Sequence, residues 1–282
     1  MDVARPEFVP DPELSREAMA DRQRDIADAA TFADDLAVDP ATVGVSGDAR
    51  QATFDALDRT SAGDDGDSDD GDCDGRETGA PLVAGVDQAF VGDRAVSVVI
   101  VLRDGEVVGR AHAVERTEIP YVPGLLSFRE GGAILSAFGE LSSVPDLAIV
   151  DGSGRIHFRE AGLATHVGVA LDLPTVGVAK RLLCGTPRES LDGKLPAGAR
   201  VAIEADADVT APDGTVIGYA VQTRQFEGGD RYVNPVYVSP GHRVGADTAA
   251  DLAERTAAGY KLPEPTRLAD AYADEVKANV SE

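Results

Sequence analysis

Three apolar segments follow one another between residues 82 and 114. They span residues 82–90, 95–102 and 106–114, and their length and β-branched content predict strands. Because only residues 91–94 and 103–105 connect them, we expect hairpins between consecutive, antiparallel strands.

After residue 120 the pattern alternates between helix and strand. A helix is predicted over about residues 129–141, and a strand over Asp146–Asp151 that a Gly-rich loop follows. The later predicted elements are a helix over 161–171, strands over 174–180, 201–204, 215–222 and 234–238, and a final helix over about 246–258. Three antiparallel strands followed by this alternation predict an α/β fold, with a mixed β-sheet flanked by helices.

The region before these strands contains one helix signal and one low-complexity segment. Asp11, Pro12 and Glu13 suit an N-cap, a proline at the first helical position and an acidic first turn, so a helix is predicted from there to about Leu36. Residues 61–79 are rich in Gly and Asp and have too few apolar side chains to order themselves. We therefore expect a flexible acidic insert there.

The acidity of the chain extends beyond this insert. The formal net charge is −24, and residues 61–77 account for −7 of it, so the other residues carry −17. With 50 Asp plus Glu, only four Lys and no Trp, the composition is typical of proteins adapted to multimolar salt. Since the Debye length falls to about 3 Å at 1 M salt, this charge does not exclude nucleic acid as a partner.

Cysteine content and hydropathy exclude other classes. Cys73 and Cys184 make neither a disulfide framework nor a zinc site. The longest strand-like apolar run, residues 95–102, is far shorter than a membrane span, and the first residues have no signal-peptide pattern. We therefore expect a cytoplasmic protein without a membrane partner.

Three acidic residues have unusual positions in the predicted elements. Asp87 lies within an apolar strand, Asp151 ends another strand, and Glu130 begins the helix that follows residues 121–124. Buried carboxylates are costly unless they are paired or bind a metal ion, and acids on central strands can converge at one end of a sheet. Their oxygens suit Mg²⁺. Ordinary caps, turns and surface charges are the alternative interpretation.

Six segments that include these residues resemble the endonuclease V family of DNA and RNA repair nucleases. They are collinear and cover most of the chain from residue 82 to residue 270, at 82–90, 120–131, 145–168, 174–185, 234–249 and 260–270. The resemblance implies an RNase H-like fold and a requirement for Mg²⁺ or Mn²⁺. It also implies cleavage of the second phosphodiester bond on the 3′ side of a deaminated purine, chiefly hypoxanthine.

The resemblance assigns catalytic roles to five residues. Asp87, Glu130 and Asp151 match the family's metal-binding and catalytic acids. Lys180 matches a lysine near the scissile phosphate. His242 matches an active-site histidine that assists the attacking water or the metal site.

Substrate contacts are implied by a second set of matches. Residues 120–124 match the wedge loop, which fills the space that a flipped base vacates. Residues 157–159 are His-Phe-Arg where the family usually has His-Pro-Arg. The expected substrate-binding residues are Tyr121, Val122, Pro123, Gly124, Leu126, Gly152, His157 and Gly177.

These expectations combine into one hypothesis. The chain is expected to be a single domain over residues 1–282, with an N-terminal helical region at 1–60, the acidic insert at 61–79 and a catalytic core at 82–270. It is expected to be a monomeric, Mg²⁺-dependent DNA-repair endonuclease for deoxyinosine and related lesions that leaves a 5′-phosphate and a 3′-hydroxyl. A ribonuclease for inosine-containing RNA and a non-catalytic lesion-binding protein are the alternatives.

Overall fold

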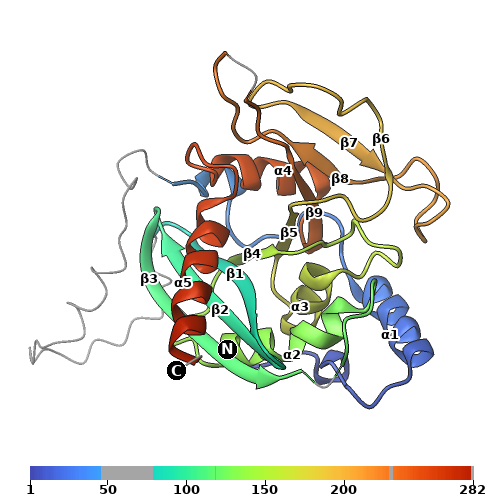
Figure 1. The fold of residues 1–282 in the computed structure, drawn as a ribbon, viewed down its shortest axis with the longest axis vertical. Helices are drawn as coiled ribbons and strands as arrows, with labels where there is room; N and C mark the ends of the chain where they lie inside the picture. Colours follow the sequence, from blue (N-terminus) through green and yellow to red (C-terminus); the bar gives the residue numbers. More distant parts are fainter. Residues whose placement is uncertain (46–78, 118, 229–230, 281–282) are drawn as a thin grey trace, which may run out of the picture.

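A nine-stranded sheet forms the centre of the fold (Figure 1). The computed structural model describes residues 1–45, 79–117, 119–228 and 231–280, so the predicted insert lies outside the described residues except for Gly79. The strands are β1 (Leu82–Val91), β2 (Arg94–Arg103), β3 (Glu106–Arg116), β4 (Leu147–Asp151), β5 (Thr175–Ala179), β6 (Thr186–Pro187), β7 (Arg200–Glu204), β8 (Val216–Val221) and β9 (Val236–His242).

Strand order and direction define the fold class. The order is β3-β2-β1-β4-β5-β9-β8-β7-β6. The first three strands form the predicted antiparallel hairpins, β4 and β5 run parallel to β1, and β9 returns antiparallel to β5. This is the RNase H-like arrangement, so the predicted fold class is confirmed. The carboxyl ends of β1, β4 and β5 consequently lie at one end of the sheet.

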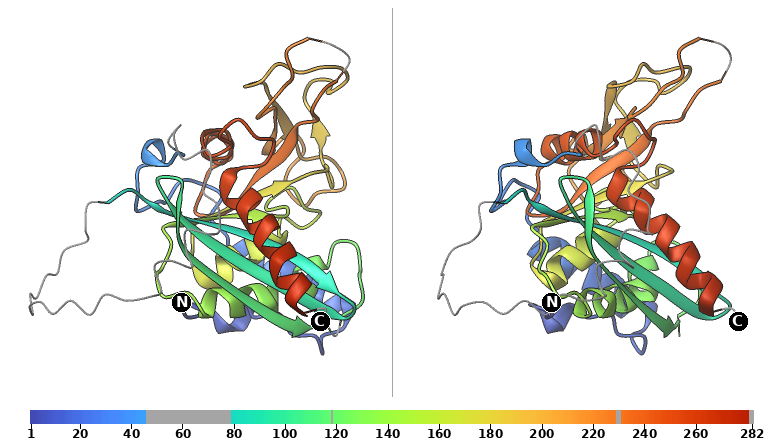
Figure 2. Two further views of the ribbon diagram at one scale, coloured as in Figure 1. Left: turned by 60° about the vertical axis from the view of Figure 1, so that its left-hand side comes forward. Right: turned by 90° about the vertical axis from the view of Figure 1, so that its left-hand side faces the viewer.

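Helices cover both faces of the sheet (Figure 2). The helices are α1 (Arg16–Ala29), α2 (Leu126–Gly139), α3 (Leu163–Leu171), α4 (Ala246–Arg255) and α5 (Glu264–Val280), with short 3₁₀ turns η1 (Pro6–Phe8) and η2 (Pro40–Thr42). Alternate residues of β2 face opposite layers. Val99 and Val101 pack in the core with α1, α2 and α3, whereas Val98 and Ile100 pack against α5.

Helix α5 is the main element that the sequence pattern did not predict. Its buried residues Leu268, Tyr272 and Val276 recur at helical spacing and pack on β2. It also crosses β1 closely, since a Cβ added at Gly85 would lie 2.0 Å from the carbonyl oxygen of Pro265. A glycine in β1 therefore permits this approach.

The first helix is shorter than predicted at both ends. Ser15 caps it, accepting a hydrogen bond from the Ala18 N–H at 3.2 Å, whereas the Asp11 side chain accepts from the nearby Glu13 N–H. After Ala29 the chain runs extended beside the end of β9, where the Arg243 N–H donates to the Thr31 carbonyl at 2.6 Å. That pairing competes with continuation of the helix.

Candidate active site

Two predicted acids meet at the ends of β1 and β4. Val86 pairs with Val150 in the parallel register, so the next residues, Asp87 and Asp151, emerge side by side. Side chains two residues apart share a strand face, and Gly85 faces α5. Asp87 therefore also points toward α5.

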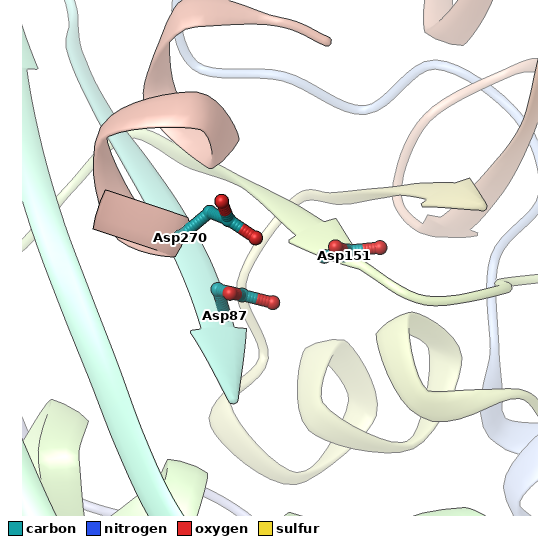
Figure 3. Close-up of side chains that lie close together, drawn as sticks. All are labelled: Asp87, Asp151 and Asp270. Atoms are coloured by element: carbon teal, nitrogen blue, oxygen red, sulfur yellow. The ribbon is translucent and has the colours of Figure 1, made fainter. Parts of the chain in front are cut away.

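A third acid, Asp270, comes from α5. One carboxylate oxygen from each of Asp87, Asp151 and Asp270 lies within 4.8 Å of the other two (Figure 3). Asp270 has no predicted role, although it ends the last matching segment, residues 260–270. The helical spacing of the apolar residues beyond position 263 is the signal that could have identified this helix and placed Asp270 opposite Asp87.

The clustering of negative charge changes the acidity of Asp87. Burial, and then the charge of Asp151, raise the pKa of Asp87 to about 8, and Asp270 adds to the increase. One of these carboxyl groups therefore holds a proton near neutral pH unless a cation neutralises the cluster.

Lys180 lies at the same end of the sheet, directly after β5. Its Nζ donates a hydrogen bond to Asp151 Oδ2 at 2.7 Å and lies 3.7 Å from Asp270 Oδ1. Burial opposes its charge, but the hydrogen bond and the neighbouring acids raise the pKa of Lys180 overall. The predicted lysine is thus an ammonium group beside the acid cluster.

Glu130 approaches the cluster from α2. Its side chain is buried, and burial raises its pKa to about 7; Arg129 opposes this shift and Asp151 adds to it. Glu130 is near enough to interact with Asp151 electrostatically, but it is not part of the group of three oxygens. A carboxyl group with a pKa near 7 is suited to exchange a proton at neutral pH.

The three clustered carboxylates fit a divalent metal ion. They offer hard oxygen atoms of the type that Mg²⁺ and Mn²⁺ take, and their mutual repulsion is the kind that a divalent cation relieves. Half of the Asp270 side chain is exposed, which leaves room for water or a phosphate oxygen on that side.

A small pocket adjoins this cluster. It has a volume of about 100 Å³, and Gly152, which lines it, directly follows Asp151. Six of the eight predicted substrate-binding residues line it: Tyr121, Pro123, Gly124, Leu126, Gly152 and His157. Tyr121 is 68% exposed at its mouth. Burial, and then the charge of Arg159, lower the pKa of His157 to about 4, so its imidazole is neutral at pH 7.

Val122 and Gly177, in contrast, do not line the pocket. Val122 packs in an apolar cluster with Met19, Ile119 and Phe128, so it anchors the wedge loop. A Cβ at Gly177 would lie 2.4 Å from the Gly154 nitrogen. The glycine therefore lets the loop after β4 lie against β5.

His242 requires a correction, because the structure does not bring it to the acids. It pairs with Thr175, the first residue of β5, whereas Lys180 follows the last residue of that strand. Its imidazole is buried, with Nδ1 accepting from the Thr31 N–H and Nε2 3.1 Å from Asp172 Oδ1. The antiparallel direction of β9 puts it at the opposite end of β5, where it joins the N-terminal segment to the sheet.

Fold and site together define an RNase H-like hydrolase with an acidic active centre. The Endonuclease V family model matches residues 72–271. An Endonuclease V of Haloarcula marismortui is 62% identical over 277 residues, covering 98% of this chain and 97% of that protein. The chain belongs to the Endonuclease V family.

Solved structures share this fold. The crystal structure of the Endonuclease V from Streptomyces avermitilis has a TM-score of 0.71 at 28% identity and covers 100% of both chains. An Endonuclease V of Ciona intestinalis, crystallised with a 23-mer DNA containing an inosine followed by a ribo-adenosine, shares the fold, with a TM-score of 0.59 at 20% identity over 95% of this chain and 100% of that one. Within the described residues, no helix is long and apolar enough to cross a membrane.

Proposed function

We propose that this chain is a Mg²⁺-dependent endonuclease that cuts a DNA strand at the second phosphodiester bond on the 3′ side of deoxyinosine, leaving a 5′-phosphate and a 3′-hydroxyl. The observation that carries the proposal is the position of the three-carboxylate cluster directly beside the pocket behind the wedge loop. The cluster is suited to phosphodiester hydrolysis, and the pocket is suited to hold a base.

Asp87, Asp151 and Asp270 would hold the metal ion, for which Mn²⁺ can substitute. When bound, such an ion lowers the pKa of the attacking water and stabilises charge on the departing 3′ oxygen. Glu130, whose buried carboxyl has a pKa raised to about 7, would be the group that takes a proton from that water near neutral pH. Lys180 holds Asp151 in place and offers its ammonium to a phosphate oxygen.

Recognition of the base is assigned to the pocket and the wedge loop. Flipping a base costs a few kcal/mol, and least for a weak pair such as one containing hypoxanthine. The exposed Tyr121 enters the gap in the stack, and the apolar wall at Leu126 packs on the flipped base. Glycine-lined backbone groups at Gly124 and Gly152 can then form hydrogen bonds with hypoxanthine.

The test compares four labelled oligonucleotides, containing deoxyinosine, inosine in RNA, deoxyuridine or no lesion, in Mg²⁺ and about 2 M KCl. We expect a single cut at the second bond 3′ of deoxyinosine, abolished by EDTA and restored by Mn²⁺. Preferential cutting of the RNA would assign the enzyme to inosine-containing RNA, and lesion binding without any cut would make it a binding protein. A monomer acting on DNA in the cytoplasm is part of the same proposal.

A further inference from the structure

The N-terminal helix α1 places one fully buried polar side chain against the pocket. Gln23 is 0% exposed, and its Nε2 donates to the Gly124 carbonyl at 2.8 Å and, more weakly, to the Ala161 carbonyl at 3.5 Å. Its Oε1 accepts from Arg159 Nη1 at 3.1 Å. All the polar atoms of this amide are therefore directed at two loops that are distant in sequence.

Both of these loops contribute walls of the pocket. Gly124 ends the wedge loop, whereas Arg159 and Ala161 belong to the segment after β4 that also carries His157. The two segments also contact each other directly, since the His157 imidazole forms a hydrogen bond with the Gly124 backbone and a Cβ at Gly124 would lie 3.4 Å from the Phe158 ring. Gln23 is thus a polar link that spans from one wall to the other.

Neighbouring contacts fix Gln23 in this position. Met19, one turn earlier on α1, is buried in the cluster that contains Ile119, Leu125 and Phe128, so the helix is anchored beneath the wedge loop. Gly124 also interacts with His157, and the Arg159 N–H donates to His157 Nδ1 at 3.2 Å. The link therefore extends from α1 to the imidazole that lines the pocket.

We propose that Gln23 is a positioning residue for lesion discrimination, holding the wedge loop and the His157 wall at the separation that admits the flipped base. This inference rests on the proposed function. It assigns part of base recognition to a helix that precedes residues 72–271, the region matched by the family model. Removing the Gln23 amide leaves the Gly124 carbonyl and the Arg159 guanidinium without this partner, which is costly for buried groups. The two loops should then move relative to each other, and the width of the pocket should change.

Two variants separate the contributions of the amide. Gln23→Met keeps the side-chain length and removes both hydrogen-bonding groups, whereas Gln23→Glu keeps an acceptor for Arg159 and loses the donor for Gly124. The matched control is Gln222→Met, since Gln222 is also buried and donates to the backbone carbonyls of Arg224 and Val233, away from the pocket.

Dissociation constants for inosine-containing and undamaged duplexes are measured with Ca²⁺ in place of Mg²⁺, followed by kcat and KM with Mg²⁺. We expect Gln23→Met to lose about tenfold in affinity for inosine DNA, equivalent to about 1.4 kcal/mol, with affinity for undamaged DNA unchanged. For Gln23→Met, KM should rise while kcat stays nearly constant. The affinity of Gln23→Glu for inosine DNA should lie between those of wild type and Gln23→Met. Gln222→Met should lower the unfolding temperature without altering discrimination.

A folded Gln23→Met that keeps the wild-type affinity ratio overturns the inference, as does an equal loss for both duplexes. If that variant does not fold, Gln23→Glu decides by the same ratio. Wild-type protein that neither binds nor cuts inosine DNA contradicts the proposed function itself. Wild-type cutting combined with an unchanged ratio in the variant contradicts only the role of Gln23.

Discussion

Asp87, Asp151 and Asp270 bring three carboxyl groups together with the ammonium of Lys180 beside them. Without a divalent ion, protonation of Asp87 relieves part of the repulsion. A bound ion relieves the same repulsion and displaces that proton, so metal affinity should increase as the pH rises toward 8.

The stability of the metal-free protein gives a test of this competition. Below pH 3.8 Asp87 is protonated in both the folded and the unfolded chain. Between 3.8 and about 8 only the unfolded chain ionises, so the free energy of unfolding falls as the pH rises through that window. Asp87→Asn removes this effect. In EDTA at about pH 8 we expect the melting temperature of the variant to lie at least 2–4 °C above that of wild type, which is roughly the shift for 1 kcal/mol. Near pH 4 the two melting temperatures should be equal. A lower melting temperature at pH 8 would contradict the raised pKa.

Asp270 is the residue whose role is tested most directly by substitution. We expect Asp270→Asn to reduce cleavage in Mg²⁺ by about 100-fold or more, because one of the three clustered carboxylates that could hold the ion is removed. Binding to inosine DNA in Ca²⁺ should persist through the wedge loop and the pocket. Asp274→Asn, an exposed acid one turn further along α5, is the control and should cut normally. Cleavage by Asp270→Asn above a tenth of wild type would remove Asp270 from the centre.

The contact between α5 and β1 determines whether Asp270 reaches the cluster. A methyl group at Gly85 would lie 2.0 Å from the Pro265 carbonyl oxygen and 2.1 Å from its carbon, so the start of α5 must move. We expect Gly85→Ala to destabilise the fold by about 1–3 kcal/mol and to reduce cleavage by about tenfold or more. Gly109→Ala in β3 is the control, because its methyl group would meet Val101 at an ordinary 3.6 Å. Cleavage kinetics and thermal unfolding of Gly85→Ala and Gly109→Ala test whether this contact is needed for stability and activity.

Local sequence patterns predict the elements whose contacts are formed between neighbours in the sequence. The apolar runs and short connections around β1, β2 and β3 predict their hairpins, and a strand ending in Asp151 predicts an acid at the end of the sheet. Helix α5 was missed although its apolar spacing is regular, because Pro263 and Pro265 interrupt the sequence where the helix begins. Without α5, Asp270 had no place in the predicted site.

Side chains whose roles depend on distant pairing are harder to predict. His242 lies in a motif-like sequence, but the direction of β9 and its pairing with Thr175 decide at which end of the sheet it lies. Gln23 has no local signal, since its partners Gly124 and Arg159 lie more than 100 residues away. Only the assembled fold shows either arrangement.

The whole molecule carries a formal charge of −24, which constrains how it holds DNA. Each phosphate neutralised by a basic residue adds about −0.9 to the slope of log K against log salt, so such contacts lose strength in concentrated salt. Contacts with a flipped base, and with the space that it leaves in the base stack, are not screened by salt in this way. Recognition at high salt should therefore depend on the wedge loop more than on arginines.

Tyr121 and Arg181 provide the comparison, since both are exposed and Arg181 follows Lys180 directly. Base–aromatic contacts are worth about 1–3 kcal/mol, so at about 2 M KCl Tyr121→Ala should lose about fivefold or more in affinity for inosine DNA. Arg181→Ala should lose less than twofold at that salt and more at about 0.2 M. Titrations with Ca²⁺ at both salt concentrations measure this. The reverse ranking at 2 M would show that recognition is electrostatic.

The origin of Asp270 in α5 also has a consequence for synthesis of the protein on the ribosome. Chains fold as they emerge from the N-terminal side, and β1 and β4 can pair before α5 has left the exit tunnel. Asp87 and Asp151 are then present without the third carboxylate of the cluster. A nascent chain that has already formed most of its sheet would therefore be unable to cut nucleic acid, and hydrolytic competence would begin only when α5 docks on β1.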